Sequence, residues 1–166
     1  MTTFLGPGRT VVVAAGYHRS MTDAAGFTVR PATPSDADRI ATLFTDEGYP
    51  AGPSDIVERL ERFASPYSTV SVAEMNGEVF GFVAVHLIPR FEHTDRFARV
   101  VALVVDPGVR ERGLGHLLMS EAERVAREGS AAFIEVTAGH HRPEARQLYE
   151  ARGYDGTVAA YLRKRL

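Results

Sequence analysis

The sequence predicts a single mixed α/β domain, and three observations lead to that prediction. First, its 166 residues, 45% hydrophobic and 24% charged, are typical of one globular core. Second, strand-like runs alternate with amphipathic helical runs from Phe27 onward. Third, Asn76-Gly77 separates two strand-like runs, and Asn-Gly is the strongest short signal for a β-hairpin. Strands and helices interleaved in this way favour a central sheet covered by helices.

Two parts of the chain are distinguished by their patterning. Residues 1–26 mix Gly, Pro and Thr without a sustained period, so we expect an N-terminal extension there and the domain at residues 27–166. Met21 is either an alternative start or an internal methionine, and the sequence leaves both open.

Each expected element rests on periodicity and on residues that break it. Strands are expected at residues 27–30, 69–74, 78–87, 98–105 and 132–137, the fourth buried on both faces, with weakly alternating edge strands in the tail 154–166. Helices are expected after Pro34 with Thr33 or Ser35 as the cap, after Pro53 with Ser54 as the cap, at residues 114–128 before Gly129, and from Pro143 to Gly153.

Charge and composition exclude several classes of function. A net charge of -2 supplies no long-range positive field, so nucleic acid is not expected as the main ligand. The chain has no cysteine, which rules out disulfides and thiolate metal sites. The run Val11–Ala15 is too short to span a membrane, so we expect a cytoplasmic protein without a membrane partner.

The most informative segment runs from a strand-like end at Val105, through a polar turn, to an amphipathic helix. A helix N-terminus offers unpaired N–H groups and a partial positive charge, which together stabilise a phosphate. Gly113 and Gly115 allow close approach to the backbone, and Arg110 and Arg112 can add charge-assisted hydrogen bonds. A glycine pair that merely eases a tight turn is the structural alternative.

Two other phosphate-binding motifs fit less well. A P-loop requires Lys and then Ser or Thr after the last glycine, where this chain has His116 and Leu117. A dinucleotide-binding motif requires Gly or Ala at Leu118, and only Glu135, at the distance of a ribose contact, favours it.

The segment resembles the pyrophosphate loop of the GCN5-related N-acetyltransferase (GNAT) superfamily, which reads Gln or Arg, two variable residues, Gly, one variable residue, then Gly or Ala. Arg110, Gly113 and Gly115 match that pattern. Residues 145–154 resemble a second family block, Ala-x-x-x-Tyr-x-x-x-Gly-Phe, and the similarity extends over nearly all of residues 27–166.

The resemblance implies a mostly antiparallel sheet with one splayed parallel pair and helices on both faces. It also implies acetyl-CoA as cosubstrate, bound where the fourth and fifth strands splay. Arg142 departs from the asparagine that many members carry at its position. The residues expected to bind the cofactor are Leu103, Val104 and Val105 through their backbone, then Arg110, Arg112, Gly113, Leu114, Gly115, His116 and Arg142.

Two residues are candidates for proton transfer. Tyr149 matches the family tyrosine near the thioester sulfur and can donate a proton to the leaving thiolate, the alternative being a core tyrosine. Glu135 interrupts an apolar run and would act as a base if buried, the alternative being an outward-facing strand residue. His140 and His141 have no metal-binding spacing, so no metal is expected.

The predicted function is transfer of an acetyl group from acetyl-CoA to an amine of a small molecule, a protein N-terminus or a lysine. Residues 45–53 and 87–97 are expected to shape the acceptor site. A non-catalytic CoA-binding regulatory module is the alternative, and a nucleotide-dependent oxidoreductase is a third interpretation. Dimerisation is common in the family, so a homodimer stays open.

Overall fold

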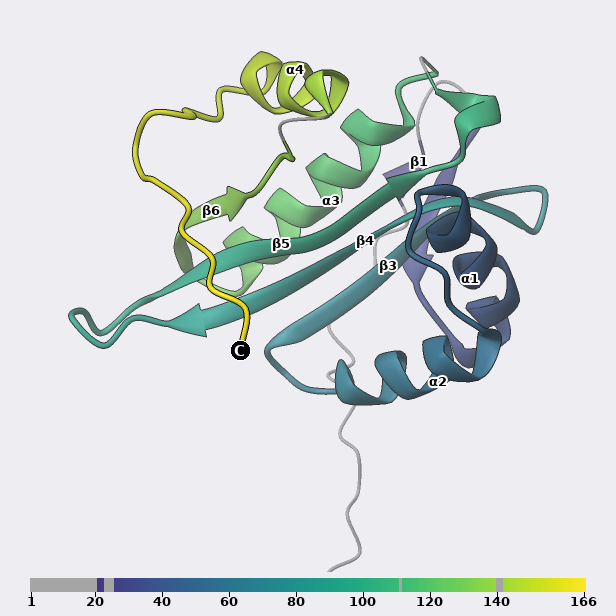
Figure 1. Cartoon of the computed structure of the whole chain (residues 1–166), viewed down its shortest axis with the longest axis horizontal. Helices are drawn as coiled ribbons and strands as arrows, with labels where there is room; N and C mark the ends of the chain where they lie inside the picture. The colour runs from purple at the N-terminus through teal and green to yellow at the C-terminus, as the bar shows by residue number, and fades with distance from the viewer. Residues whose placement is uncertain (1–20, 23–25, 111, 140–141) are drawn as a thin grey trace, which may run out of the picture.

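The protein is described by a computed structural model at residues 21–22, 26–110, 112–139 and 142–166 (Figure 1). Within these residues a six-stranded sheet has its strands in sequence order. The strands are β1 (Met21–Thr22), β2 (Thr28–Pro31), β3 (Ser68–Met75), β4 (Glu78–Pro89), β5 (Arg96–Val105) and β6 (Ala131–Val136). Neighbours from β1 to β5 are antiparallel, and β5 and β6 are parallel. The predicted mixed sheet is confirmed.

Helices cover both faces of this sheet, as predicted. A 3-10 turn, η1 (Pro34–Asp36), leads into α1 (Ala37–Asp46), and α2 (Pro53–Arg62) follows on the same face. The other face is covered by α3 (Leu114–Glu128) and α4 (Pro143–Ala151). In Figure 1, α1 and α2 lie in front of the sheet and α3 lies behind it.

Each face has its own hydrophobic core. On the α1 side, Ile40, Leu43 and Ile56 pack against Phe82 and Val104 of the sheet. On the α3 side the buried residues include Leu114, Leu118, Met119 and Ala122 from α3, Val83, Val85, Ala98 and Val100 from the sheet, and Tyr149 from α4. The sheet therefore separates two apolar layers, and α4 belongs with α3.

The hairpin between β3 and β4 forms where the sequence predicts it. Met75 pairs with Glu78, so Asn76 and Gly77 alone make the turn. Both have positive φ, 55° and 81°, which is the backbone of a type I′ turn and the reason for Asn-Gly at this place.

The first helical segment begins as predicted, but the second differs. At Thr33 the backbone N–H donates to the Asp36 carboxylate at 2.7 Å, which satisfies an amide at the start of η1. The prediction of Ser54 as the cap of the second helix is wrong. The helix begins at Pro53 with Gly52 as its N-cap, and the Gly52 amide donates to Asp55 at 2.8 Å.

Two further predictions are corrected. Residues 154–166 form no strand; the tail runs back past β5, where the Tyr161 ring centroid lies 5.6 Å from Arg99 Cζ (Figure 1). The strand Arg96–Val105 is not buried on both faces along its length, because Val101 is 46% exposed. Val101 lies at a shift in the register with β4, between Val100 and Ala102, and has no partner residue in that strand.

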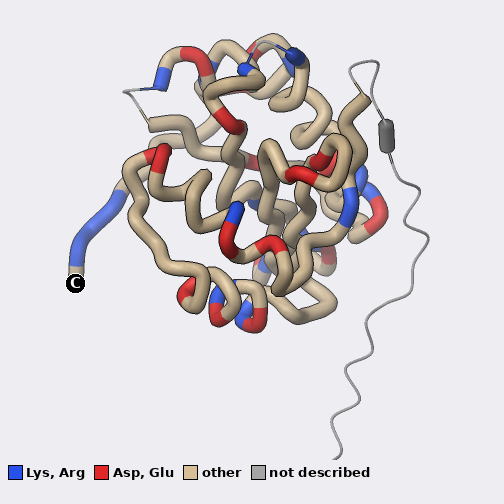
Figure 2. Tube along the Cα trace, turned by 90° about the vertical axis from the view of Figure 1, so that its right-hand side faces the viewer, with Lys and Arg blue, Asp and Glu red and all other residues tan. Residues whose placement is uncertain are grey.

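The described residues carry charges of both signs and form no helix that could cross a membrane. Lys and Arg are interspersed with Asp and Glu along the chain, and a basic segment lies at the C-terminal end (Figure 2). Across the described part of the chain, every helix is too short or too polar to traverse a lipid bilayer. Met21 and Thr22, assigned above to an N-terminal extension, pair with β2, and residues 1–20 and 23–25 of that extension lie outside the described residues.

Candidate functional site

In the turn between β5 and α3, the first backbone N–H groups of the helix have no hydrogen-bond partner among the described residues. The strand β5 ends at Val105, and Asp106 accepts a hydrogen bond from the Gly108 amide at 2.6 Å, which shapes a 3-10 turn at Pro107–Val109. The helix α3 begins at Leu114, and its first backbone bond inside the helix runs from Leu117 N to Gly113 O at 3.0 Å. No side chain of a described residue caps this end. The amides of residues 114–116 are therefore left over at the start of the helix, an arrangement that can bind an anion.

The two glycines of this turn have different structural roles. Gly113 is the N-cap of α3 with φ +82°, a left-handed conformation that favours glycine, and a Cβ there would meet nothing within 4 Å. Gly115 has an ordinary backbone, but a Cβ on it would lie 3.1 Å from Leu148 Cδ2 of α4. Gly113 thus permits the turn, and Gly115 permits α3 to approach α4 closely.

Beside this turn, β5 has an open edge. The Asp106 amide donates to Phe80 O at 2.7 Å, so by the alternation of an antiparallel ladder the backbone of Val104 also bonds β4. The backbone groups of Leu103 and Val105 consequently point to the opposite edge. There β6 pairs with β5 only between Arg96 and Val100, so the two strands splay before Leu103 is reached. The predicted splayed parallel pair is present.

The arginines of the loop lie apart from one another. Arg110 is half exposed, and its Nη2 donates to Glu47 Oε1 at 2.6 Å. Arg112 is exposed, and its guanidinium Cζ lies 5.2 Å from the centroid of the Phe27 ring. His116 is exposed on the first turn of α3, and its carbonyl accepts from Ser120 Oγ at 3.0 Å.

Glu47 joins the loop to the start of α4, and sequence reasoning did not identify it. Its side chain is only 10% exposed, and its second oxygen, Oε2, lies 2.5 Å from Arg142 Nη1. Arg142 Nη2 also donates to the carbonyl of Glu47 at 3.2 Å, and the Arg142 Cζ lies 5.9 Å from the centroid of the Tyr49 ring. One carboxylate thus bridges two guanidiniums that come from opposite sides of the splay. No sequence signal links position 47 to positions 110 and 142.

Tyr149 lies on α4 in the core beside α3. Its side chain is 8% exposed, and its ring centroid lies 5.9 Å from that of Tyr154. Burial raises the pKa of the Tyr149 phenol, and the positive charge of Arg142 offsets only part of that rise. The phenol is therefore protonated at neutral pH and can donate a proton.

Glu135 occupies a different environment from the one its sequence context suggested. It lies on β6, its side chain is 39% exposed, and it forms an ion pair with Arg99 of β5. Burial, the condition for its predicted role as a base, is therefore not met. Arg99 and Glu135 alternate with Ala98 and Ile134, which face α3, so the pair lies on the sheet face opposite Tyr149. The structure does not bring the two candidates for proton transfer together.

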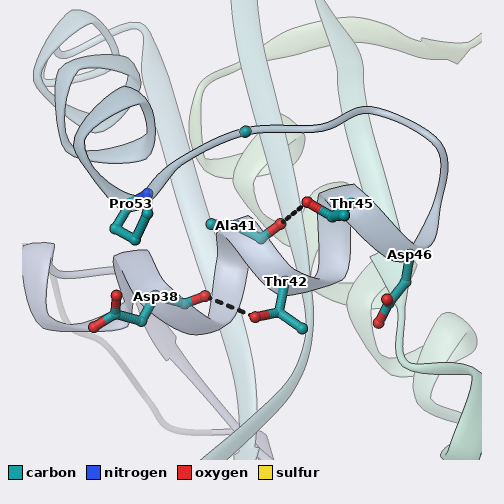
Figure 3. A pocket seen from close by; sticks show the side chains of 7 residues that line it. Asp38, Ala41, Thr42, Thr45, Asp46 and Pro53 are labelled. Carbon is teal, nitrogen blue, oxygen red and sulfur yellow. Dashed lines mark hydrogen bonds between the residues drawn. The ribbon is translucent and has the colours of Figure 1, made fainter.

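A shallow hollow of about 350 Å³ lies along α1. Asp38, Thr42, Thr45 and Asp46 line it together with Ala51 and with Pro53, the first residue of α2 (Figure 3). The two threonine hydroxyls donate to helix carbonyls, Thr42 to Asp38 at 3.0 Å and Thr45 to Ala41 at 2.9 Å. The two hydroxyls are therefore engaged within α1, and the carboxylates of Asp38 and Asp46 are the charged groups that line the hollow.

Metal ligands are not grouped in the described part of the chain, where no three His, Asp or Glu side chains converge on one point. His140 and His141 lie outside the described residues.

Comparison with known proteins gives consistent results. The model of the acetyltransferase (GNAT) family matches residues 37–154. The uncharacterized N-acetyltransferase YhfO of Bacillus subtilis is 32% identical over 134 residues, 76% of this chain and 89% of the relative. The aminoalkylphosphonate N-acetyltransferase of Salmonella typhimurium is 31% identical over 83 residues, 50% of this chain and 54% of the relative.

Solved structures show the same fold at lower sequence identity. A transcriptional regulator from Bacillus halodurans has a TM-score of 0.78 at 21% identity, covering 84% of this chain and 99% of the other. The aminoglycoside N-acetyltransferase AAC(6')-Iy in complex with CoA has a TM-score of 0.72 at 14% identity, covering 84% and 95%.

Proposed function

The chain belongs to the acetyltransferase (GNAT) family of N-acetyltransferases, and from this premise we propose that it binds acetyl-CoA on the loop Arg110–Gly115 and transfers the acetyl group directly to an amine. The observation that carries the proposal is the uncapped N-terminus of α3, placed next to the open edge of β5. An anion site and a row of unpaired strand groups suit the two halves of CoA, its pyrophosphate and its amide-containing pantetheine arm.

Each half of the cofactor has a matching set of protein groups. The amides of Leu114, Gly115 and His116 would bond the pyrophosphate, and Arg110 would add charge to it. Leu103 and Val105 would pair with the pantetheine amides as a further strand does, whereas Val104 contributes through its place in the β4–β5 ladder. Arg112 is held over Phe27 and would act through its charge.

The chemistry needs three proton movements. The ammonium loses one proton, and the free amine attacks the thioester carbon; the C–N bond forms, the C–S bond breaks, and the leaving thiolate takes a proton from a donor. The nitrogen then loses its second proton as the amide forms, and that proton restores the donor. Tyr149 is proposed as the donor of that proton, because its phenol is neutral and lies on the helix that contacts the start of α3. Glu135 is proposed to receive the ammonium proton through water, because it is 39% exposed and lies with Arg99 on the sheet face opposite Tyr149.

The acceptor is proposed to be a small-molecule amine in preference to a protein N-terminus or a lysine. A relative 31% identical over half of this chain is named for aminoalkylphosphonates, which are small amines. A non-catalytic regulatory module is disfavoured, because the relatives that match by sequence are N-acetyltransferases.

Thermal unfolding with CoA tests the binding half of this proposal. A ligand that binds only the folded state adds about 2.7 kcal/mol of stability at a hundred times its dissociation constant. We expect CoA and acetyl-CoA to raise the melting temperature, and NAD and ATP to raise it much less. Arg110→Gln should reduce the CoA effect, whereas Arg127→Gln, a change to a 73% exposed arginine at the other end of α3, should not. A shift from NAD or ATP without one from CoA would refute the proposal.

A further inference from the structure

Glu47 is the point at which the proposed cofactor site meets the segment expected to shape the acceptor site. It follows α1 directly and is nine-tenths buried, and each of its carboxylate oxygens bonds a different guanidinium. Oε1 accepts from Nη2 of Arg110, in the loop after β5, at 2.6 Å. Oε2 pairs with Nη1 of Arg142, at the start of α4, at 2.5 Å. The two oxygens can therefore change partners separately.

Binding of CoA would change only one of these partners. A pyrophosphate at the start of α3 carries more negative charge than a carboxylate and accepts several charge-assisted hydrogen bonds, so it competes for Arg110. Arg110 can turn to it because that side chain is half exposed, whereas Arg142 is only 26% exposed and contacts both the carboxylate and the carbonyl of Glu47. After this exchange Oε1 faces the cleft, and Glu47 and Arg142 remain as a neutral pair.

The remaining pair lies at the N-terminal end of the helix that carries the group proposed to protonate the thiolate. Arg142 is the N-cap of α4, and its charge acts on the Tyr149 phenol. An acceptor that approaches the thioester past this end of α4 would meet both a carboxylate and a guanidinium. The charge of the acceptor decides how well it fits between them.

A cationic amine without an acidic group fits this pair poorly. It would bring a second positive charge beside Arg142 with only one carboxylate to balance the two, and that carboxylate is nine-tenths buried and so weakly screened. An amine that carries a carboxylate brings no net charge, and one that carries a phosphonate brings a net negative charge. In both, the ammonium pairs with Glu47 and the acid pairs with the guanidinium of Arg142.

We propose that the acceptor is a small amine bearing an acidic group, a phosphonate or carboxylate, with Glu47 Oε1 as the ligand of its ammonium and Arg142 as the ligand of its acid. This inference rests on the proposed function and specifies the acceptor class of the same site. It assigns Arg142 to the acceptor, and Arg142 is the position at which the chain departs from the asparagine common in the family.

The experiment compares three probes of similar length: 2-aminoethylphosphonate, β-alanine and propylamine. With saturating acetyl-CoA, the rate of thiol release gives kcat/KM for each. We expect kcat/KM for the two acidic amines to exceed that for propylamine by about tenfold or more, because a hydrogen bond to a charged group contributes on this scale. Arg142→Gln should abolish this preference while propylamine is still acetylated, and Arg142→Lys should restore part of it.

Two further variants distinguish direct contacts with the acceptor from a general effect of positive charge on α4. Arg146→Gln removes a 67% exposed cation from the same helix, and it should leave the preference unchanged. Glu47→Gln should raise KM for all three amines more than it lowers kcat, without weakening the binding of CoA measured by calorimetry.

The outcomes are distinguishable from failure of the proposed function. If no amine supports thiol release, N-acetyl transfer itself is refuted for these acceptors. If propylamine reacts as well as the acidic amines, the acceptor class is refuted and the transfer reaction stands. If Arg142→Gln keeps the preference, Arg142 is refuted as the ligand of the acid. Weaker CoA binding by Glu47→Gln would show that Glu47 supports Arg110 in the pyrophosphate site and does not compete with the cofactor.

Discussion

The backbone of Gly115 lies so close to Leu148 that a Cβ on it would approach Leu148 Cδ2 to 3.1 Å. Gly115 lies in the first turn of α3, and Leu148 directly precedes Tyr149 on α4. The helix end proposed to hold the pyrophosphate therefore contacts the helix that carries the proposed proton donor. A change at this contact should therefore affect both the binding of the pyrophosphate at α3 and the position of Tyr149 on α4.

Replacing Gly115 with Val should displace α4. The added branched side chain overpacks the contact with Leu148, and overpacking of this kind costs about 1–3 kcal/mol of stability. We expect a lower melting temperature and weaker CoA binding, measured by thermal unfolding and calorimetry. Leu148→Ala in the same protein should recover part of the CoA affinity, because it removes the atoms that clash. If the Gly115→Val protein binds CoA as tightly as the parent does, the contact between α3 and α4 does not contribute to CoA binding.

Tyr149→Phe should reduce turnover with little effect on folding. The substitution removes one hydroxyl and keeps the ring that packs beside Tyr154. Loss of a positioned acid lowers the rate by roughly 10²- to 10⁴-fold, and CoA affinity should stay near that of the parent, as expected for an interaction made in the transition state. Single-turnover transfer excludes slow product release as the cause. A single-turnover rate equal to that of the parent would assign Tyr149 to packing alone.

Glu135→Gln distinguishes a base from a structural ion pair. If Glu135 accepts the ammonium proton, activity should fall more at neutral pH than at high pH, where the free amine is already abundant. Arg99→Met is the matched control, because it breaks the same ion pair and keeps the carboxylate. Equal losses in both variants at every pH would mean that the pair only positions β6 against β5.

Asp36 should make folding stability depend on acid pH. Burial opposes its ionisation, but hydrogen bonds from Arg30 and Thr33 outweigh burial and hold the pKa of Asp36 below its usual value. Because the folded pKa is the lower one, the stabilisation is present above the unfolded value of about 3.9 and is lost as pH falls through the folded pKa. Urea unfolding should show a difference between the parent and Asp36→Asn that shrinks toward low pH. A difference that stays constant with pH would assign the effect to packing.

The features that were predicted from the sequence depend on short stretches of chain. The turn at Asn76-Gly77 and the helix start at Gly113 need backbone conformations that few residues adopt, so their residue types are visible locally. Gly115 differs, because glycine is needed there for the close approach of Leu148 from α4, which comes later in the chain.

The features that were missed depend on long-range contacts. Glu47 lies 63 residues from Arg110 and 95 from Arg142, and no local pattern records such contacts. The weak alternation of residues 154–166 predicted edge strands, but alternation without a neighbouring strand does not make a sheet. Glu135 stood out in an apolar run, and only the fold shows Arg99 beside it.

The most direct test of the central claim is release of the CoA thiol from acetyl-CoA, measured with and without an amine. The account predicts slow release by the protein with acetyl-CoA alone and much faster release with an accepted amine, and mass spectrometry should show one acetyl group on that amine for each thiol released. Thiol release that no amine accelerates across a broad set of small amines, protein N-termini and lysine peptides, with no acetylated product, would contradict the account.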